Sequence, residues 1–359
     1  MNTIWCAISG HGFGHAAQVV PVLNELGPRV PGLRVILRTA VPAPFFKDRL
    51  TVPWELQPVQ QDVGCIQHGP LEIDVAATWE ALASFHADWT SRLTEEKRAL
   101  TASKPRVILA DTPYLAIQAG YDTGIPAVAM ANFTWSEALL PFIEQDRPAH
   151  RSLVNTIEQA YSHATLALRC MPGLPMPAFS TVADIGPIAQ PARSRRRELR
   201  AVLKAAESDC VVLIGFGGIP LVSLPWEEMN AMTGYHFIVD GIPADATDWI
   251  HPLAMLPYSF KELLASVDLI LTKPGYGTIV ESVALRQPVV YVRRYNFADE
   301  APLVSFLHQY GRGRELSVKD FQNGNWLTAF QAVRQLPIPN APPSYTGAAD
   351  AARHLAAYF

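Results

Sequence analysis

The 359-residue sequence lacks several features that define whole classes of protein. Its four cysteines, Cys6, Cys65, Cys170 and Cys210, are far apart and have no CxxC or Cys/His spacing, which argues against a zinc site. No apolar run reaches the roughly 18 residues expected of a membrane span, and no basic segment followed by a long apolar one opens the sequence. We therefore expect a soluble, cytoplasmic protein with free thiols.

The sequence also lacks an excess of positive charge. Its 29 Lys and Arg residues face 33 Asp and Glu residues, for a formal net charge of -4. A protein that neutralises a nucleic-acid backbone needs a basic surface, so we exclude nucleic acid as a partner. The dense basic run at residues 193–200 is interpreted as a solvated helix start rather than a phosphate site.

What the sequence does contain is enough apolar material for two cores. Hydrophobic residues make up 49% of the chain, and a domain holds about 100–200 residues, so we expect two domains. Short apolar runs alternate with amphipathic stretches in both halves, which predicts two doubly wound, Rossmann-like α/β sheets. The predicted strands are residues 3–9, 33–39, 106–110, 126–130, 165–168, 210–215, 235–239, 268–272 and 288–292. The predicted helices are residues 16–26, 76–102, 114–123, 259–266, 278–285, 302–310 and 348–359.

A Pro-containing stretch at residues 183–196 is interpreted as the linker between the domains. This places an N-terminal domain at residues 1–186 and a C-terminal domain at residues 187–340. A connector and helix at residues 341–359 are expected to pack back on the first domain. The carboxyl ends of both sheets then face each other, which is the usual place for a ligand in such folds.

The first motif is SGHGFGHA at residues 9–16, where a strand gives way to a helix. A dinucleotide fingerprint is disfavoured, because it needs glycine where His15 stands. An imidazole fixed at such a turn can take a proton from a hydroxyl, so His15, and less so His11, is a candidate base. The alternatives are that both histidines only cap the turn, or that they bind a metal, which is disfavoured because no Glu follows the first histidine.

The second motif is ILADTPYLA at residues 108–116, a buried strand that ends in an acid. The carboxylate of Asp111 can orient an imidazole and stabilise its protonated form. It can equally cap the following helix, with Pro113 in the first turn. Both interpretations stay open at this point.

The third motif is LTKPGYGTIVESVA at residues 271–284. A helix start that follows a glycine-rich break can bind an anion through its free N–H groups, and Lys273 adds a positive charge. Thr278 is expected to cap a helix that runs from the next residue, and Glu281 either completes a capping box or accepts hydrogen bonds from a ribose. The motif differs from the GxxxxGK[ST] of P-loop proteins, so ATP hydrolysis is disfavoured.

These motifs resemble those of glycosyltransferases with the GT-B fold, and most strongly the glycosyltransferase-like N-terminal half of plant L-arabinokinases. The resemblance is carried by GHGFGHA (10–16), DVGCIQ (62–67), NFTW (132–135), GYGTIVES (275–282) and RRYNFADE (293–300). It covers nearly the whole chain. Plant-type UDP-glycosyltransferases and the peptidoglycan N-acetylglucosaminyltransferase are more distantly similar. The kinase half of the arabinokinases has no counterpart here, so sugar kinase activity is not implied.

The resemblance implies a role for each site residue. His15 matches the acceptor base and Asp111 its carboxylate partner, in an acceptor-binding first domain. His11, Phe133 and Trp135 would line the acceptor pocket. The donor-binding residues would be Gly14, Gly217, Leu256, Lys273, Gly275, Tyr276, Gly277, Thr278, Glu281, Asp299 and Glu300. Lys273 replaces a histidine of the superfamily and Glu300 a glutamine, and these two departures bear on which donor is used.

The sequence therefore predicts an inverting transfer of a sugar from a UDP-sugar to an acceptor hydroxyl, with no cofactor and no metal. Two alternatives are a UDP-sugar epimerase of GT-B fold and a non-catalytic nucleotide-sugar-binding protein. Arg293 and Arg294 are interpreted as surface ion pairs. Residues 42–54, expected to be a loop of mixed apolar and charged character, leave peripheral membrane contact open. The sequence indicates neither the oligomeric state nor the acceptor.

Overall fold

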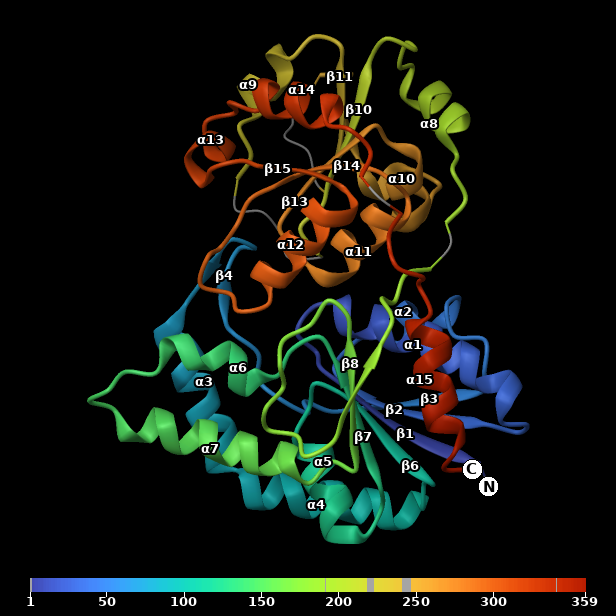
Figure 1. Ribbon diagram of the computed structural model, residues 1–359, viewed down its shortest axis with the longest axis vertical. Helices are drawn as coiled ribbons and strands as arrows, with labels where there is room; N and C mark the ends of the chain where they lie inside the picture. The colour runs from blue at the N-terminus through green and yellow to red at the C-terminus, as the bar shows by residue number, and fades with distance from the viewer. Residues whose placement is uncertain (1, 191, 218–222, 241–246, 340) are drawn as a thin grey trace.

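The computed structural model describes residues 2–190, 192–217, 223–240, 247–339 and 341–359. Two α/β domains follow one another along the long axis of the molecule (Figure 1). The first domain is built on a seven-stranded sheet of order β3-β2-β1-β6-β7-β8-β9, in which every neighbouring pair is parallel. Its strands are β1 (Thr3–Ile8), β2 (Arg34–Thr39), β3 (Trp54–Pro58), β6 (Val107–Asp111), β7 (Ala127–Ala131), β8 (Leu166–Cys170) and β9 (Val182–Ile185).

The helices of the first domain cover both faces of this sheet (Figure 1). They are α1 (Gly14–Leu26), α2 (Pro44–Lys47), α3 (Val75–Ala87), α4 (Trp89–Ser103), α5 (Leu115–Thr123), α6 (Trp135–Leu139) and α7 (Pro148–Ser162). A short antiparallel ribbon, β4 (Gln67–His68) and β5 (Glu72–Ile73), precedes α3. The single helix predicted at residues 76–102 is wrong in one respect, because Asp88 ends α3 and begins α4. The loop predicted at residues 42–54 contains α2 and the first residue of β3.

The second domain is built on a six-stranded parallel sheet of order β12-β11-β10-β13-β14-β15. Its strands are β10 (Cys210–Ile214), β11 (Tyr235–Val239), β12 (Ile250–Pro252), β13 (Leu269–Thr272), β14 (Pro288–Tyr291) and β15 (Arg312–Glu315). Its helices are α8 (Arg196–Leu203), α9 (Trp226–Ala231), α10 (Phe260–Ser266), α11 (Tyr276–Ala284), α12 (Glu300–Tyr310), α13 (Val318–Gln322) and α14 (Leu327–Gln335).

Both sheets are buried on both faces, as parallel sheets with helices on each side require. All residues of β1, β6, β7, β10, β13 and β14 are buried, which is why these strands read as continuous apolar runs in the sequence. The four cysteines are free and buried. Burial raises the pKa of the Cys6 thiol, as expected of an inert packing residue rather than a nucleophile.

The C-terminal helix α15 (Gly347–Ala356) crosses back from the second domain and packs beside α1 of the first (Figure 1). A close approach at Gly347 permits this return, since an added Cβ there would lie 2.0 Å from the Gly186 carbonyl oxygen. The linker predicted at residues 183–196 begins too early, because Ala183 to Ile185 are paired in β9.

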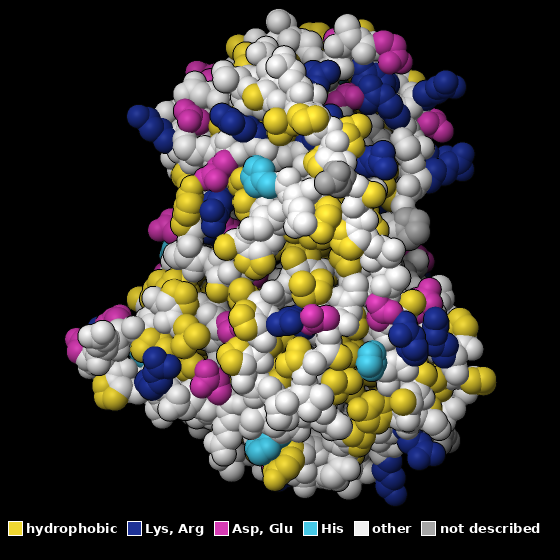
Figure 2. Space-filling view, viewed as in Figure 1, with side chains coloured by type: hydrophobic (Ala, Val, Ile, Leu, Met, Phe, Trp, Pro, Cys, Tyr) yellow, Lys and Arg dark blue, Asp and Glu magenta, His cyan; other side chains and the backbone are white. Residues whose placement is uncertain are grey.

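The surface carries charged side chains over both domains, with Lys and Arg gathered over α8 (Figure 2). This is the basic run at residues 193–200, which does lie at a helix start. Its Arg196 and Arg200 pair with Asp268 of the neighbouring strand end instead of standing free in solvent. Among the described helices, none is long and apolar enough to cross a membrane.

Candidate active site

A histidine and an aspartate meet where β1 and β6 end. The two strands are neighbours, with Ile8 opposite Asp111, so the turn after β1 and the last residue of β6 share one sheet edge. His15, in the first turn of α1, places Nδ1 2.9 Å from Oδ1 of Asp111. Asp111 does not cap the helix that follows it, because α5 begins at Leu115 without a side-chain cap. The capping alternative for Asp111 is therefore wrong, and the carboxylate–imidazole pair is present.

The pair is almost withdrawn from solvent, with His15 8% and Asp111 0% exposed. Burial by itself lowers the pKa of His15, but the ion pair and hydrogen bond with Asp111 outweigh it, and Asp62 and Asp299 add to the rise. The pKa of His15 is therefore held above its ordinary value. Because Nδ1–H donates to Asp111, the second ring nitrogen, Nε2, is the one available to a substrate. It has no hydrogen-bond partner among the residues that the structure describes.

His11 has a different environment. Its Nε2 lies 3.1 Å from Nε2 of Gln67, and its ring packs edge-on against Trp135 at 5.5 Å. Burial, together with His15, Lys273 and Arg294, lowers the pKa of His11 to about 3. His11 is therefore a neutral side chain at physiological pH. In the described part of the chain, no group of three or more His, Cys, Asp or Glu side chains is arranged to hold a metal ion.

Two aromatic residues expected to line the acceptor pocket do lie beside the histidines. The rings of Phe133 and Trp135 are 6.0 and 6.1 Å from the His15 ring. Trp135 is fully buried, and its indole N–H donates to Asp62 at 2.7 Å. Phe133 also contacts Phe297 of the second domain, with ring centroids 6.0 Å apart. The aromatic wall therefore spans the junction between the domains.

Sequence reasoning gave no role to Asp62, which is buried within this cluster. Its carboxylate accepts hydrogen bonds from Ser9, Thr112 and Trp135. It lies in the coil between β3 and β4, where no periodic pattern marks a site. The DVGCIQ motif at residues 62–67 was the available signal, because it belongs to the resemblance without having a structural explanation.

On the other side of the junction, Lys273 follows the end of β13 and precedes the start of α11. The helix begins at Tyr276 with Gly275 as its N-cap, earlier than predicted, so Thr278 is a residue of the first turn and not a cap. The predicted capping box is wrong. Gly275 and Gly277, like Gly14 across the junction, have no other group within 4 Å of an added Cβ, so the backbone at these glycines faces open space. A helix start of this kind presents free N–H groups to an anion.

The Lys273 amine has no hydrogen bond or ion pair to any described residue; besides burial, only the charges of Arg294, Asp299 and Glu300 act on it. Burial and the neighbouring Arg294 lower the pKa of Lys273 to about 7, against attraction from Asp299 and Glu300. The loops after β1 and β10 meet beside it. An added Cβ on Gly217 would lie 3.7 Å from Cε of Lys273, and one on Gly12 would lie 3.6 Å from the Gly217 carbonyl oxygen.

Two residues predicted to bind the nucleotide-sugar donor, Tyr276 and Glu281, make contacts within the protein. The Tyr276 hydroxyl donates to the Met171 carbonyl at 3.0 Å and accepts from the Ile188 N–H at 3.1 Å, so it joins the two domains. Oε1 of Glu281 lies 3.0 Å from Nζ of Lys261, a residue of α10 that sequence reasoning missed. Burial raises the pKa of Glu281, and Lys261 opposes that rise. Leu256, half-buried after a short 3-10 turn, packs against the apolar core.

Asp299 and Glu300 lie at the start of α12 and are both buried. Oδ2 of Asp299 accepts from Nδ2 of Asn132 at 3.2 Å, across the junction, while its Oδ1 has no partner among the described residues. Glu300 accepts from the backbone N–H and Nε of Arg294, at 3.0 and 2.6 Å. Arg294 also lies 3.8 Å above the Phe297 ring. The surface interpretation is therefore wrong for Arg294, whose guanidinium is buried with Glu300.

These residues all follow the carboxyl ends of strands. The first sheet contributes them at or after the ends of β1, β3, β6 and β7, and the second after β10, β12, β13 and β14. In open α/β sheets this is the edge at which ligands bind. The His15–Asp111 pair of the first domain therefore faces Lys273 and the start of α11 in the second domain.

Known proteins resemble the chain in sequence. It is 31% identical over 348 residues to an L-arabinokinase of Arabidopsis thaliana, which covers 95% of this chain and 32% of that protein. The chain therefore spans about a third of the length of this relative. No protein-family model matches the chain.

Solved structures share its fold. The glycotransferase of kitacinnamycin gives a TM-score of 0.64 at 16% identity, covering 99% of this chain and 94% of that one. UGT2 of Phytolacca americana, complexed with UDP-2fluoro-glucose and pterostilbene, gives a TM-score of 0.61 at 15% identity, covering 99% and 94%. The predicted architecture is confirmed: the chain has the two-domain GT-B fold of glycosyltransferases and is related in sequence to L-arabinokinase.

Proposed function

We propose that this protein is an inverting glycosyltransferase that moves a sugar from a UDP-sugar to an acceptor hydroxyl. The observation that carries the proposal is the 2.9 Å contact between His15 Nδ1 and Asp111 Oδ1, which leaves Nε2 free at the domain junction. The similar enzyme of Phytolacca americana was solved with UDP-2fluoro-glucose and pterostilbene, which supports a UDP-sugar donor.

In the proposed step, Nε2 of His15 takes the proton of the acceptor hydroxyl while that oxygen attacks the anomeric carbon. The bond between the anomeric carbon and the diphosphate oxygen breaks on the opposite face, and its electron pair leaves with the UDP. Asp111 stabilises the imidazolium that forms, and it fixes the ring so that Nε2 faces the acceptor. General-base catalysis of this kind is worth roughly 10²–10⁴ in rate.

The leaving diphosphate would be stabilised by Lys273 and by the N–H groups at the start of α11. Its negative charge favours the protonated amine, so donor binding would raise the low pKa of Lys273. Oδ1 of Asp299, which has no partner among the described residues, would accept from a donor-sugar hydroxyl. Glu281 with Lys261 would hold the ribose. With these groups the proposed transfer needs no metal ion.

Kinase activity is not part of the proposal. The chain spans about a third of the L-arabinokinase, and its helix start after β13 lacks the GxxxxGK[ST] sequence of a P-loop. The phosphate-binding features described above suit a diphosphate leaving group.

Thermal-shift measurements with UDP, TDP, GDP and ADP test the donor first. A nucleotide at 100 times its dissociation constant stabilises the fold by roughly 2.7 kcal/mol, so UDP should raise the melting temperature most. UDP-glucose with and without a mixture of hydroxylated acceptors then tests the reaction. Release of UDP only with an acceptor supports transfer, whereas an epimerised UDP-sugar without acceptor would indicate an epimerase. Binding without any turnover would indicate a non-catalytic protein.

A further inference from the structure

We propose that Asp62 is a positioning residue, a second buried carboxylate that holds the loops around His15 and stabilises the protonated imidazole. The proposal rests on the function proposed for His15 above. It assigns a role to a charged group that the His15–Asp111 pair leaves unexplained. Asp62 is 5% exposed and hydrogen-bonded to three different segments of the chain.

The three contacts join the loops that follow three adjacent strands. Oδ1 of Asp62 accepts from Oγ of Ser9 at 3.0 Å, directly after β1. Its Oδ2 accepts from Nε1 of Trp135 at 2.7 Å, after β7, and from Oγ1 of Thr112 at 3.4 Å, after β6. Thr112 has a φ of 30°, a strained value for a β-branched residue, so its backbone needs support from its neighbours.

Each contact leads on to the proposed catalytic pair. Oγ of Ser9 accepts from the His11 N–H at 3.3 Å, and the Ser9 N–H donates to the Asp111 carbonyl at 2.9 Å. The Trp135 ring that Asp62 fixes lies 6.1 Å from the His15 ring. The Asp62 carboxylate therefore fixes the position of the Trp135 ring beside the His15 imidazole.

The loop that carries Asp62 also lies against the histidine turn. At Gly64, an added Cβ would be 2.5 Å from Nδ1 of His11 and 2.9 Å from the Trp135 ring. No side chain larger than hydrogen fits there without displacement. The close approach keeps Asp62 at a fixed place relative to the histidines.

Asp62 is suited to be ionised. A carboxylate accepts at both oxygens, and Ser9, Thr112 and Trp135 all donate to it. Burial holds the pKa of Asp62 above its ordinary value, and the bonds from Trp135, Ser9 and Thr112 together with the charge of His15 limit that rise. Both oxygens of Asp62 are engaged within the protein and the residue is 5% exposed, so we assign it positioning and not proton transfer with the substrate.

The charged groups that act on His15 are acidic, whereas those that act on the adjacent His11 are basic. Asp111 after β6, Asp62 in the coil before β4 and Asp299 before α12 favour its protonated form. On the other side, Lys273 and Arg294 act on the adjacent His11. When His15 takes a proton from the acceptor, the negative charge of Asp62 stabilises the product of that proton transfer.

The test is a pH titration of the His15 ring by NMR, with the resonance assigned from its loss in His15→Gln. In Asp62→Asn, which keeps the shape and removes the charge, the midpoint should fall by about 1 pH unit. The matched control is Asp122→Asn, which changes an exposed pair with Lys97 and should leave the midpoint unchanged. An unchanged midpoint in Asp62→Asn would overturn the proposal. This readout needs no activity, so failure of the transferase proposal is seen separately, in the absence of UDP release by wild type.

A second variant covers the case in which Asp62→Asn does not fold. Trp135→Phe keeps a ring in the wall and removes the indole N–H that Asp62 accepts. It should lower kcat about tenfold with little change in KM and with the pH profile displaced, because the Asp62 carboxylate loses a donor. A wild-type kcat and pH profile in Trp135→Phe would exclude a positioning role.

Discussion

In the described part of the chain, two buried histidines each lie beside an aspartate, at opposite ends of their sheets. His15 Nδ1 is 2.9 Å from Asp111, and His236 Nε2 is 3.3 Å from Asp209. The residue types are the same and both histidines are buried. Asp111 is the last residue of β6, whereas Asp209 precedes β10 and His236 is near the start of β11.

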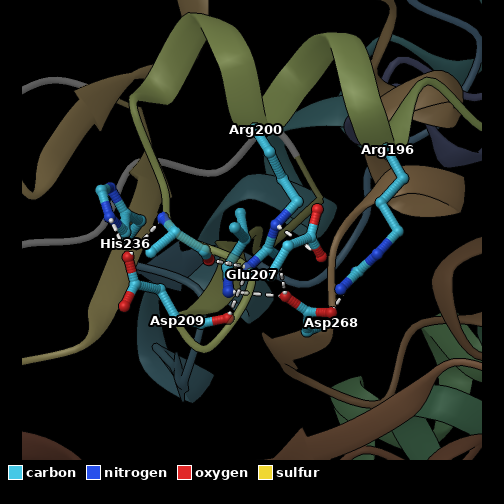
Figure 3. Close-up of polar contacts among 8 residues, drawn as sticks. Arg196, Arg200, Glu207, Asp209, His236 and Asp268 are labelled. Carbon is cyan, nitrogen blue, oxygen red and sulfur yellow. Dashed lines mark hydrogen bonds and ion pairs between the residues drawn. The ribbon is translucent and has the colours of Figure 1, made fainter.

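The second pair belongs to a network of hydrogen bonds and ion pairs that connects structural elements of the second domain (Figure 3). Asp268 accepts from the side chains of Arg196 and Arg200 and from the Val211 N–H. Arg200 also donates to backbone carbonyls, including that of Asp209 at 2.9 Å. The network ties α8 to the amino ends of β10 and β13, so its charges serve packing.

The two pairs have the same residue types, so what distinguishes the candidate catalytic pair from the structural one is the end of the strands at which each lies. At the carboxyl ends, neither Nε2 of His15 nor the Lys273 amine has a partner among the described residues, and both lie at the junction with the other domain. His236 also has a ring nitrogen without a hydrogen bond, but that nitrogen is buried at the amino end of its sheet, away from the junction. At the amino ends, the acids and arginines are paired with each other. Ligands of α/β proteins bind at the carboxyl edge, where helix starts and loops face the site.

The largest effect should come from removing each histidine in turn. His15→Ala is expected to lower transfer by roughly 10²–10⁴, the value of a general base. His236→Ala should leave the rate within about threefold of wild type, because no group at the domain junction depends on it. Initial rates of UDP release, at saturating donor, measure both. A threefold loss or less in His15→Ala would remove the distinction between the two pairs.

Substitution of Asp268 should lower stability more than activity, and substitution of Asp111 should lower activity more than stability. Asp268→Asn removes the negative charge 2.9 Å from the Arg200 guanidinium, whose side chain is 4% exposed, and leaves it Glu207 at 3.8 Å and backbone carbonyls. It should cost about 2 kcal/mol of unfolding free energy. At urea concentrations too low to unfold it, the Asp268→Asn variant should be as active as wild type. Asp111→Asn should show the reverse, a large loss of rate with a smaller loss of stability. Urea unfolding monitored by Trp fluorescence, with rates measured on the same samples, tests both.

A smaller effect is expected at Lys273, on the donor side of the junction. Lys273→Met should weaken UDP binding about tenfold, the loss of one charge-assisted hydrogen bond. The free amine has a pKa of about 7, so at pH 8 it is mostly neutral, and a bound diphosphate raises that pKa. Wild type should therefore take up protons on binding UDP at pH 8. Calorimetry in two buffers of different ionisation enthalpy measures the uptake, which should vanish in Lys273→Met; equal uptake in both proteins would contradict this account.

Much of the fold could be read from local pattern. The central strands are short, apolar and bounded by turn residues, so β1, β6, β10 and β13 were predicted within a residue or two. The edge strands β3, β9, β12 and β15 were not, because they are only partly buried and carry polar residues. The break at Asp88 was missed since the hydrophobic period continues across it.

Within the site, sequence motifs identified residues at the strand-to-helix turns, namely His15, Asp111 and Lys273. The resemblance also paired His15 with Asp111, and the two are in contact in the structure, but the further partners Asp62 and Lys261 were not predicted. Asp62 lies 53 residues from Ser9, and Lys261 and Glu281 belong to different helices, so no local spacing connects them. Tyr276 and Arg294 were given the wrong environment, because their neighbours come from the other domain or from a later turn.

The sequence by itself determined the alternation of strands and helices, because periodicity and burial are encoded locally along the chain. It also determined which residue types stand at the glycine-rich turns. The tertiary structure alone decided which of those residues meet. Parallel strands bring together loops distant in the chain, and the junction of two domains places the His15–Asp111 pair and Lys273 on opposite sides of the candidate site.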